Sequence, residues 1–183
     1  NTSMLLLKNL TAQLLCLFTF IPAVFADQYP FNYQIDIQHY AFALTLSDDT
    51  DEIIGTASIE ILFKSNDVGQ FRLDLANKTQ ERPGKGMEVS SVTSEGTPLK
   101  YRHQGDALVI KMHQPVGKEI LKTFIIEYRG IPEAGLEIKN NHFGDRTFFC
   151  ESWPNNTRHW LPTIDHPYEK ATVEFKIIAP NKY

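Results

Sequence analysis

Apolar residues that recur at every second position dominate this sequence and constrain its fold more than any other feature. In "GTASIEILFK" the side chains of Ala57, Ile59, Ile61 and Phe63 point to one face and the residues between them to the other. The same period occurs in "FRLDLA", "ALVIKMH", "EILKTFIIEYRG" and "ATVEFKIIAP". No window carries a long, capped apolar stripe of helical period. The sequence therefore predicts an all-β domain, a twisted antiparallel β-sandwich or saddle.

The segment "YQIDIQHYAFALTL" predicts an opening strand or strand pair, and its apolar face reverses near His39 and Tyr40. One extra residue in a strand produces such a reversal, so we expect a β-bulge there. Clusters of turn-forming residues such as "SDDTDE", "SEGTP" and "HQGD" separate the predicted strands. Short strands at regular spacing agree with the sandwich prediction.

Length and charge limit the classes of function. The chain has 183 residues, of which 42% are hydrophobic and 22% charged, which suits one folded domain with a core of its own. The formal net charge is −4 and no basic stripe is present, so we expect no nucleic-acid partner.

The N-terminal segment "MLLLKNLTAQLLCLFTFIPAVFA" differs from the rest of the chain. Lys8 precedes an apolar run that ends in small residues at Val24 and Ala26, the layout of a secretory signal cleaved after Ala26. We therefore assign 1–26 to a helical signal peptide, with 1–3 as extra residues before its Met, and 27–183 to the β domain. The apolar run is short for a bilayer span, so no stable membrane span is expected after cleavage. The protein is expected to be exported, to a periplasm or the extracellular space.

Loss of the leader leaves Cys150 as the one cysteine, so no disulfide within the domain is expected. We expect Cys150 to be a small buried residue. It opens the segment "CESWPNNTRHWLPTIDHP", which contains both tryptophans of the chain and ends at Pro167. The segment predicts a rigid corner: Trp160 buried, Arg158 paired with Asp165 or stacked on an indole, and prolines that bend the chain path.

Motifs of enzymes are missing from the sequence. We find no H-E-x-x-H, no Walker loop, no G-x-S-x-G and no dinucleotide fingerprint. His159 and His166 are seven residues apart, and the prolines at 162 and 167 keep them off a common helix face, so we predict no metal site in this chain. A free-standing, exported β-sandwich that binds glycans or proteins is an alternative, with Trp153 and Trp160 as stacking surfaces.

The segment "WPNNTRHWLPTIDHPYEKATVEFKIIAP", preceded by "QHYAFALTL" and "IIGTASIEILF", resembles the N-terminal domain of the aminopeptidase N family of zinc metallopeptidases. It is most similar to the exported bacterial branch, and the resemblance covers about 33–183. It implies a β saddle that packs on a thermolysin-like catalytic domain, which carries H-E-x-x-H, a further Glu and the G-x-M-E-N loop. None of these occurs here. The resemblance therefore implies a non-catalytic domain, inactive alone, whose parent enzyme removes N-terminal residues with a zinc-activated water and a Glu as general base.

One family feature extends into this domain. A carboxylate or amide side chain just before the Arg-containing motif helps the G-x-M-E-N loop bind the α-amine of a peptide substrate, a charge-assisted contact worth about 1.5–3 kcal/mol. By position the best candidate here is Glu151. Many relatives carry their Gln or Glu where this chain has Trp153, so Trp153 is the second candidate for substrate binding. The resemblance assigns Arg158, Trp160, Asp165 and Pro167 to the structural motif.

Overall fold

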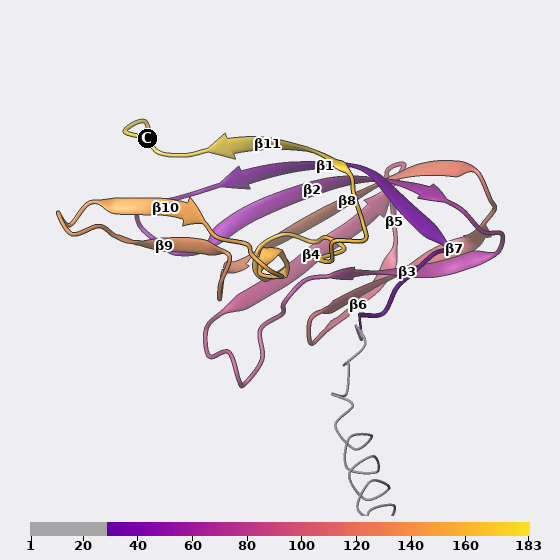
Figure 1. Ribbon diagram of the computed structural model, residues 1–183, viewed down its shortest axis with the longest axis horizontal. Coiled ribbons are helices and arrows are strands. Elements are labelled where there is room, and N and C mark those ends of the chain that lie inside the picture. The colour runs from indigo at the N-terminus through magenta and orange to yellow at the C-terminus, as the bar shows by residue number, and fades with distance from the viewer. Residues whose placement is uncertain (1–28) are drawn as a thin grey trace, which may run out of the picture. The chain divides into compact units, whose positions relative to one another are not determined.

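Most of the alternating segments form strands of a large twisted sheet (Figure 1), seen in a computed structural model that describes residues 29–183. Its strand order is β11 (Thr172–Ile178), β1 (Ile35–Thr45), β2 (Ile53–Phe63), β8 (Ile120–Ile131), β4 (Gly86–Ser94) and β5 (Thr97–Pro98). All neighbours in this sheet are antiparallel except β1 and β11, which run parallel. The predicted leader lies outside the described residues.

Two smaller sheets complete the described part of the chain. One contains β3 (Val68–Asp74), β7 (Ala107–Val116) and β6 (Lys100–Gln104), and the other is the hairpin of β9 (Leu136–Asn140) and β10 (Arg146–Cys150). Within residues 29–183 the helical structure is a single 3-10 turn, η1 (Thr157–His159). The prediction of an all-β sandwich is confirmed, with the correction that one strand pair is parallel.

The core lies between the large sheet and the three-stranded sheet. Phe71 of β3 contacts Phe63 of β2 and Phe124 of β8, with ring centroids 6.3 and 4.7 Å apart. The alternation predicted for β2 is observed as a row of buried side chains from Ala57 to Phe63. Such a row on each facing sheet is the basis of sandwich stability.

The predicted bulge in the first strand is also observed. The pairing of β1 with β2 shifts register between Ile37 and His39. On both sides of the shift alternate residues stay buried, including Ile35, Ile37, Tyr40 and Phe42. The bulge thus lets one long strand keep its apolar side chains in the core despite the reversed pattern.

The edge of the large sheet at β11 is open. All seven residues of β11 are exposed, although its Phe175 lies on the same face as the buried Phe42 of β1. A groove of about 500 Å³ runs beside it, towards the β9–β10 hairpin. Leu44, Phe148, Phe149, Trp160, Phe175 and Tyr183 line the groove with apolar surface. Buried side chains therefore fill the centre of the sandwich, whereas the space beside β11 is an open apolar groove.

Candidate functional site

The segment between β10 and β11 is tied to β3 rather than being a free loop. The backbone N–H of Asp74 donates to the carbonyl of Thr163 at 2.6 Å, and the N–H of Thr163 donates back to Asp74 at 3.1 Å. A further backbone bond joins the N–H of Ala76 to the carbonyl of Arg158 at 2.8 Å. These bonds place η1 and the residues after it along the end of the three-stranded sheet.

Charged side chains fix the same segment from within. The Arg158 guanidinium donates through Nε to Asp165 Oδ2 at 3.0 Å, and the Arg158 backbone N–H donates to the same oxygen at 3.1 Å. The backbone N–H of Asp165 in turn donates to Oδ2 of the buried Asp74 at 3.0 Å, and Arg72 Nη2 donates to Asp74 Oδ1 at 2.7 Å. Of the two arrangements expected for Arg158, pairing with Asp165 is the one observed.

Asp74 is the residue at this site that the sequence did not reveal. The alternation in "FRLDLA" places it on the polar face of β3, yet the structure buries it completely. Its partner Asp165 lies ninety-one positions further along the chain. An acid two positions after an arginine in the same strand was the available signal, because a buried carboxylate requires donors to offset its desolvation.

Trp160 forms the apolar base of the segment. Its side chain is only 6% exposed and stacks on Phe175 at a centroid distance of 6.1 Å, and its indole N–H lies 3.4 Å from the Ser152 hydroxyl. Gly135 sits against it with a positive φ of 80°, and a Cβ there would overlap the Asn156 carbonyl. Close packing therefore requires glycine at 135, a second feature that local pattern did not indicate.

The rim of the segment is exposed, in contrast to its base. Glu151 is anchored through its backbone N–H, which donates to the Gly135 carbonyl at 2.8 Å, while its side chain is exposed. Trp153 is 78% exposed and precedes a cis peptide bond to Pro154. The two candidates for substrate binding thus lie two residues apart on a fixed turn.

The expectation of a buried Cys150 is wrong: it is exposed, because it is the last residue of a hairpin strand with an uncovered face.

The turn after Asp165, which contains Pro167, is held against β1. Glu169 Oε1 accepts a hydrogen bond from the backbone N–H of Ile37 at 3.0 Å, and burial raises the pKa of Glu169. The backbone N–H of Ile164 donates to the buried Tyr40 hydroxyl at 3.1 Å. The segment is therefore attached to β3 of the three-stranded sheet and to β1 of the large sheet.

The histidines of the segment do not form a metal site with their neighbours. His159 Nδ1 lies 3.3 Å from Glu133, which also pairs with Arg82 at 2.5 Å, and burial lowers the pKa of His159. Residues 29–183 contain no group of three or more His, Cys, Asp or Glu side chains that could hold a metal ion. Nor does any of these residues lie in a helix of the length and apolarity that a membrane span requires.

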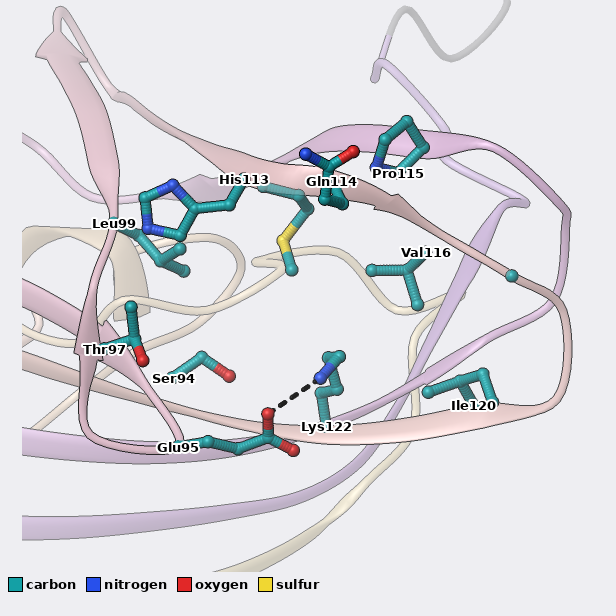
Figure 2. A pocket seen from close by; sticks show the side chains of 12 residues that line it. Ser94, Glu95, Thr97, Leu99, His113, Gln114, Pro115, Val116, Ile120 and Lys122 are labelled. Carbon is teal, nitrogen blue, oxygen red and sulfur yellow. Dashed lines mark hydrogen bonds and ion pairs between the residues drawn. The ribbon is translucent and has the colours of Figure 1, made fainter.

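A second hollow, of about 390 Å³, lies between two hairpins on another part of the domain. Figure 2 shows the ion pair of Lys122 and Glu95 on one wall, at 3.0 Å, with His113 and Gln114 on the opposite wall. The His113 ring lies 2.8 Å from the Pro98 carbonyl and so has a partner within the wall itself. No lining residue comes from the Cys150–Pro167 segment, and no cluster of reactive groups faces the hollow.

The fold of the described residues corresponds to that of a class of known structures. The chain matches no family model, and no curated protein is a match. Among solved structures, the fold is that of part of the M1 zinc metallopeptidases.

Three solved structures illustrate the likeness. The M1 zinc metallopeptidase of Deinococcus radiodurans has a TM-score of 0.66 and 21% identity, over 80% of this chain and 33% of that one. A two-domain M1 zinc metallopeptidase variant bound to L-tryptophan has a TM-score of 0.67 and 21% identity, over 81% of this chain and 34% of its own. Leukotriene A4 hydrolase of Saccharomyces cerevisiae has a TM-score of 0.69 and 20% identity, over 87% and 26%. This chain thus spans about a third or less of the length of each.

Proposed function

We propose that this chain is the N-terminal, non-catalytic β domain of a zinc aminopeptidase that removes N-terminal residues from peptides. One observation carries the proposal: 80–87% of the chain has the fold of M1 zinc metallopeptidases while covering only 26–34% of their length. The sequence motif from Trp153 to Pro180 adds independent support. In this proposal the domain, residues 27–183, packs on its own catalytic domain.

Zinc belongs to the absent catalytic domain in this proposal. The described residues offer no set of three ligands, whereas a catalytic zinc site uses three protein ligands and an open position. No step of the reaction is therefore assigned to this chain, and the domain alone is expected to be inactive.

The role proposed for the domain is to form one wall of the pocket for the substrate N-terminus. The support is the contrast between a fixed base and an exposed rim: Arg158, Asp165 and Trp160 hold the turn, and Glu151 and Trp153 project from it. A carboxylate at Glu151 would pair with the α-ammonium of a peptide, and the Trp153 ring could cover it. An internal amide has no such cation, so the contact would favour chain ends.

Reading the gene beyond the codon for Tyr183 tests the proposed class. An H-E-x-x-H and a G-x-M-E-N in the same frame are the expected result. A stop codon or an unrelated module there would contradict the proposal.

Substrate kinetics of the full-length enzyme test the proposed role. Glu151→Gln should raise KM for amino-acid anilides by about tenfold. It removes a charge-assisted contact that the enzyme makes both with the bound substrate and in the transition state. Trp153→Ala is the companion variant. Glu88→Gln is the control, because Glu88 is an exposed acid on β4 that pairs with Lys78. An unchanged KM in both site variants would remove the segment from the pocket.

The exposure of Trp153 also supports a second candidate, a free-standing exported module that binds glycans or proteins. An exposed indole is a stacking surface for a sugar ring, and the fold is a β-sandwich in either case. Titration of the domain with oligosaccharides, followed by Trp fluorescence, distinguishes the two: saturable quenching that Trp153→Ala abolishes would favour the binding module. Export to a periplasm or the extracellular space is part of both proposals and rests on the leader sequence alone.

A further inference from the structure

The long loop between β3 and β4, residues 75–85, carries an arginine whose side chain packs against the domain. The loop turns back on itself at this point: the N–H of Arg82 donates to the Thr79 carbonyl at 3.2 Å, and the N–H of Lys85 donates to the Arg82 carbonyl at 3.0 Å. Only 19% of the Arg82 side chain is exposed, although the residue lies in a loop. Its guanidinium is therefore held by protein groups rather than by solvent alone.

The Arg82 guanidinium pairs with two carboxylates from separate connections. Its Nη1 lies 2.8 Å from Oδ1 of Asp106, in the turn between β6 and β7. Its Nε donates at 2.5 Å to Oε2 of Glu133, in the connection between β8 and β9. The donors of an arginine form a rigid fork and can hold two acids at once, whereas a lysine ammonium is a compact charge on a flexible stem. Arg82 therefore joins its own loop to both connections.

The connection that contains Glu133 contacts both ends of the turn that carries the candidates for substrate binding. Oε2 of Glu133 lies 3.3 Å from Nδ1 of His159, the last residue of η1. Two residues after Glu133, the Gly135 carbonyl accepts from the backbone N–H of Glu151 at 2.8 Å. Gly135 also lies against the Asn156 carbonyl, which a Cβ at 135 would overlap. A shift of this connection would therefore shift the turn as well.

The charge of Arg82 also acts on His159. Burial is the main cause that lowers the pKa of His159. The negative charges of Glu133 and Asp106 oppose this effect, and the positive charges of Arg82 and Arg158 add to it. Loss of the Arg82 charge would leave Glu133 with His159 as its remaining ion-pair partner among the described residues. Both consequences favour the protonated imidazole, so the pKa of His159 should rise.

We propose that Arg82 is a positioning residue for the turn that carries Glu151 and Trp153, and that it acts by holding Glu133 against η1. The positioning is a property of this chain alone and does not depend on the peptidase. Its consequence for substrates rests on the proposed function, because a displaced turn would weaken the pairing of Glu151 with the α-ammonium of a peptide.

NMR of the chain from Asp27 onward tests the positioning, since residues 31–183 form a compact unit with their own core. The chain has two tryptophans, so labelling with fluorotryptophan should give two fluorine resonances, and Trp153→Phe identifies that of Trp153. Arg82→Gln should shift or broaden the Trp153 resonance. It should also raise the pKa of His159 towards the ordinary value of about 6.5, followed through the ring protons and assigned with His159→Gln.

Two further variants separate the charge of Arg82 from its fork. Arg82→Lys keeps the charge but cannot bridge both acids, so it should leave the pKa of His159 near that of the wild type and still alter the Trp153 resonance. Arg102→Gln, at an exposed position of β6, is the matched control and should change neither. Circular dichroism verifies that each variant folds. A folded Arg82→Gln variant with an unchanged Trp153 resonance would overturn the inference, and so would a His159 pKa that fails to rise.

Kinetics of the full-length enzyme extend the test to substrates. Arg82→Gln should raise KM for amino-acid anilides several-fold with little change in kcat, as expected when a contact made in both substrate complex and transition state is weakened. Arg102→Gln should match the wild type. A raised KM in Glu151→Gln together with a wild-type KM in Arg82→Gln would overturn the positioning role. A wild-type KM in both Glu151→Gln and Trp153→Ala would contradict the proposed pocket, and the NMR result alone would then decide the positioning.

Discussion

At the scale of single residues, the buried acids determine how the site segment is held. Asp74 and Asp165 are both buried, and each accepts bonds from an arginine side chain and from a backbone N–H of the segment. Buried carboxylates persist only where such donors offset the cost of desolvation. Their arrangement explains why an exposed Glu151 and Trp153 can sit on a turn of fixed shape.

Asp165→Asn tests this explanation. Removing one partner of a buried pair leaves the Arg158 guanidinium without its counter-charge, so the free energy of unfolding should fall by about 3–5 kcal/mol. Urea denaturation followed by the fluorescence of Trp160 measures the change. The exposed Glu151→Gln is the control and should stay within about 0.5 kcal/mol of wild type. A small loss in Asp165→Asn would show that the backbone bonds alone fix the segment.

His103 provides a pH test of the interior. Burial lowers the pKa of His103, against the smaller opposing effects of its contact with the Leu75 carbonyl at 2.8 Å and of the Asp106 charge. The unfolded state therefore binds a proton more readily than the folded state, so stability is complete above about pH 6.5 and falls as the pH drops through the folded pKa. His103→Gln should lose this dependence, as urea midpoints at several pH values would reveal. An identical pH profile in wild type and variant would contradict it.

At the scale of strands, those with uninterrupted alternation were predictable, and those with interrupted alternation or only a few residues were not. The periods in "GTASIEILFK" and "EILKTFIIEYRG" correspond to β2 and β8, because the core side of a central strand accepts only apolar side chains. β4 was missed since a register shift between Val89 and Ser91 interrupts its alternation. β9 and β10 have five residues each, too few for a period to be distinguished from chance.

Two tyrosines, on the strands that flank β2, are expected to respond in opposite ways to the loss of their hydroxyl groups. Tyr128 on β8 packs over Gly55, where a Cβ would overlap its ring, and its buried hydroxyl has no hydrogen-bond partner among the described residues. Tyr40 on β1 instead accepts from the backbone N–H of Ile164. Tyr128→Phe should therefore raise the free energy of unfolding by about 1 kcal/mol, whereas Tyr40→Phe should lower it by about 1–3 kcal/mol.

Urea denaturation of both variants measures these changes in one experiment. The pair controls for the generic effect of removing a hydroxyl group, because the substitution is identical. Equal changes of the same sign in the two variants would contradict the hydrogen-bond assignment.

At the scale of the whole molecule, the sequence indicated the fold and the motif but not how distant segments meet. Arg158 and Asp165 are seven positions apart, and their pairing could be expected from the motif. Asp74, Gly135 and the parallel partnership of β1 with β11 arise from contacts between residues far apart in the chain. Periodicity reports the environment of one strand and carries no information about which strand lies beside it.

We propose that this β domain forms one wall of a peptidase whose zinc-bearing domain is a separate part of the polypeptide. Hydrolysis of amino-acid anilides, measured side by side for the product of the full reading frame and for the chain ending at Tyr183, tests it most directly. We expect the longer product to release amino acids and the shorter one to release none. Release by the chain ending at Tyr183, or an inactive longer product, would contradict it.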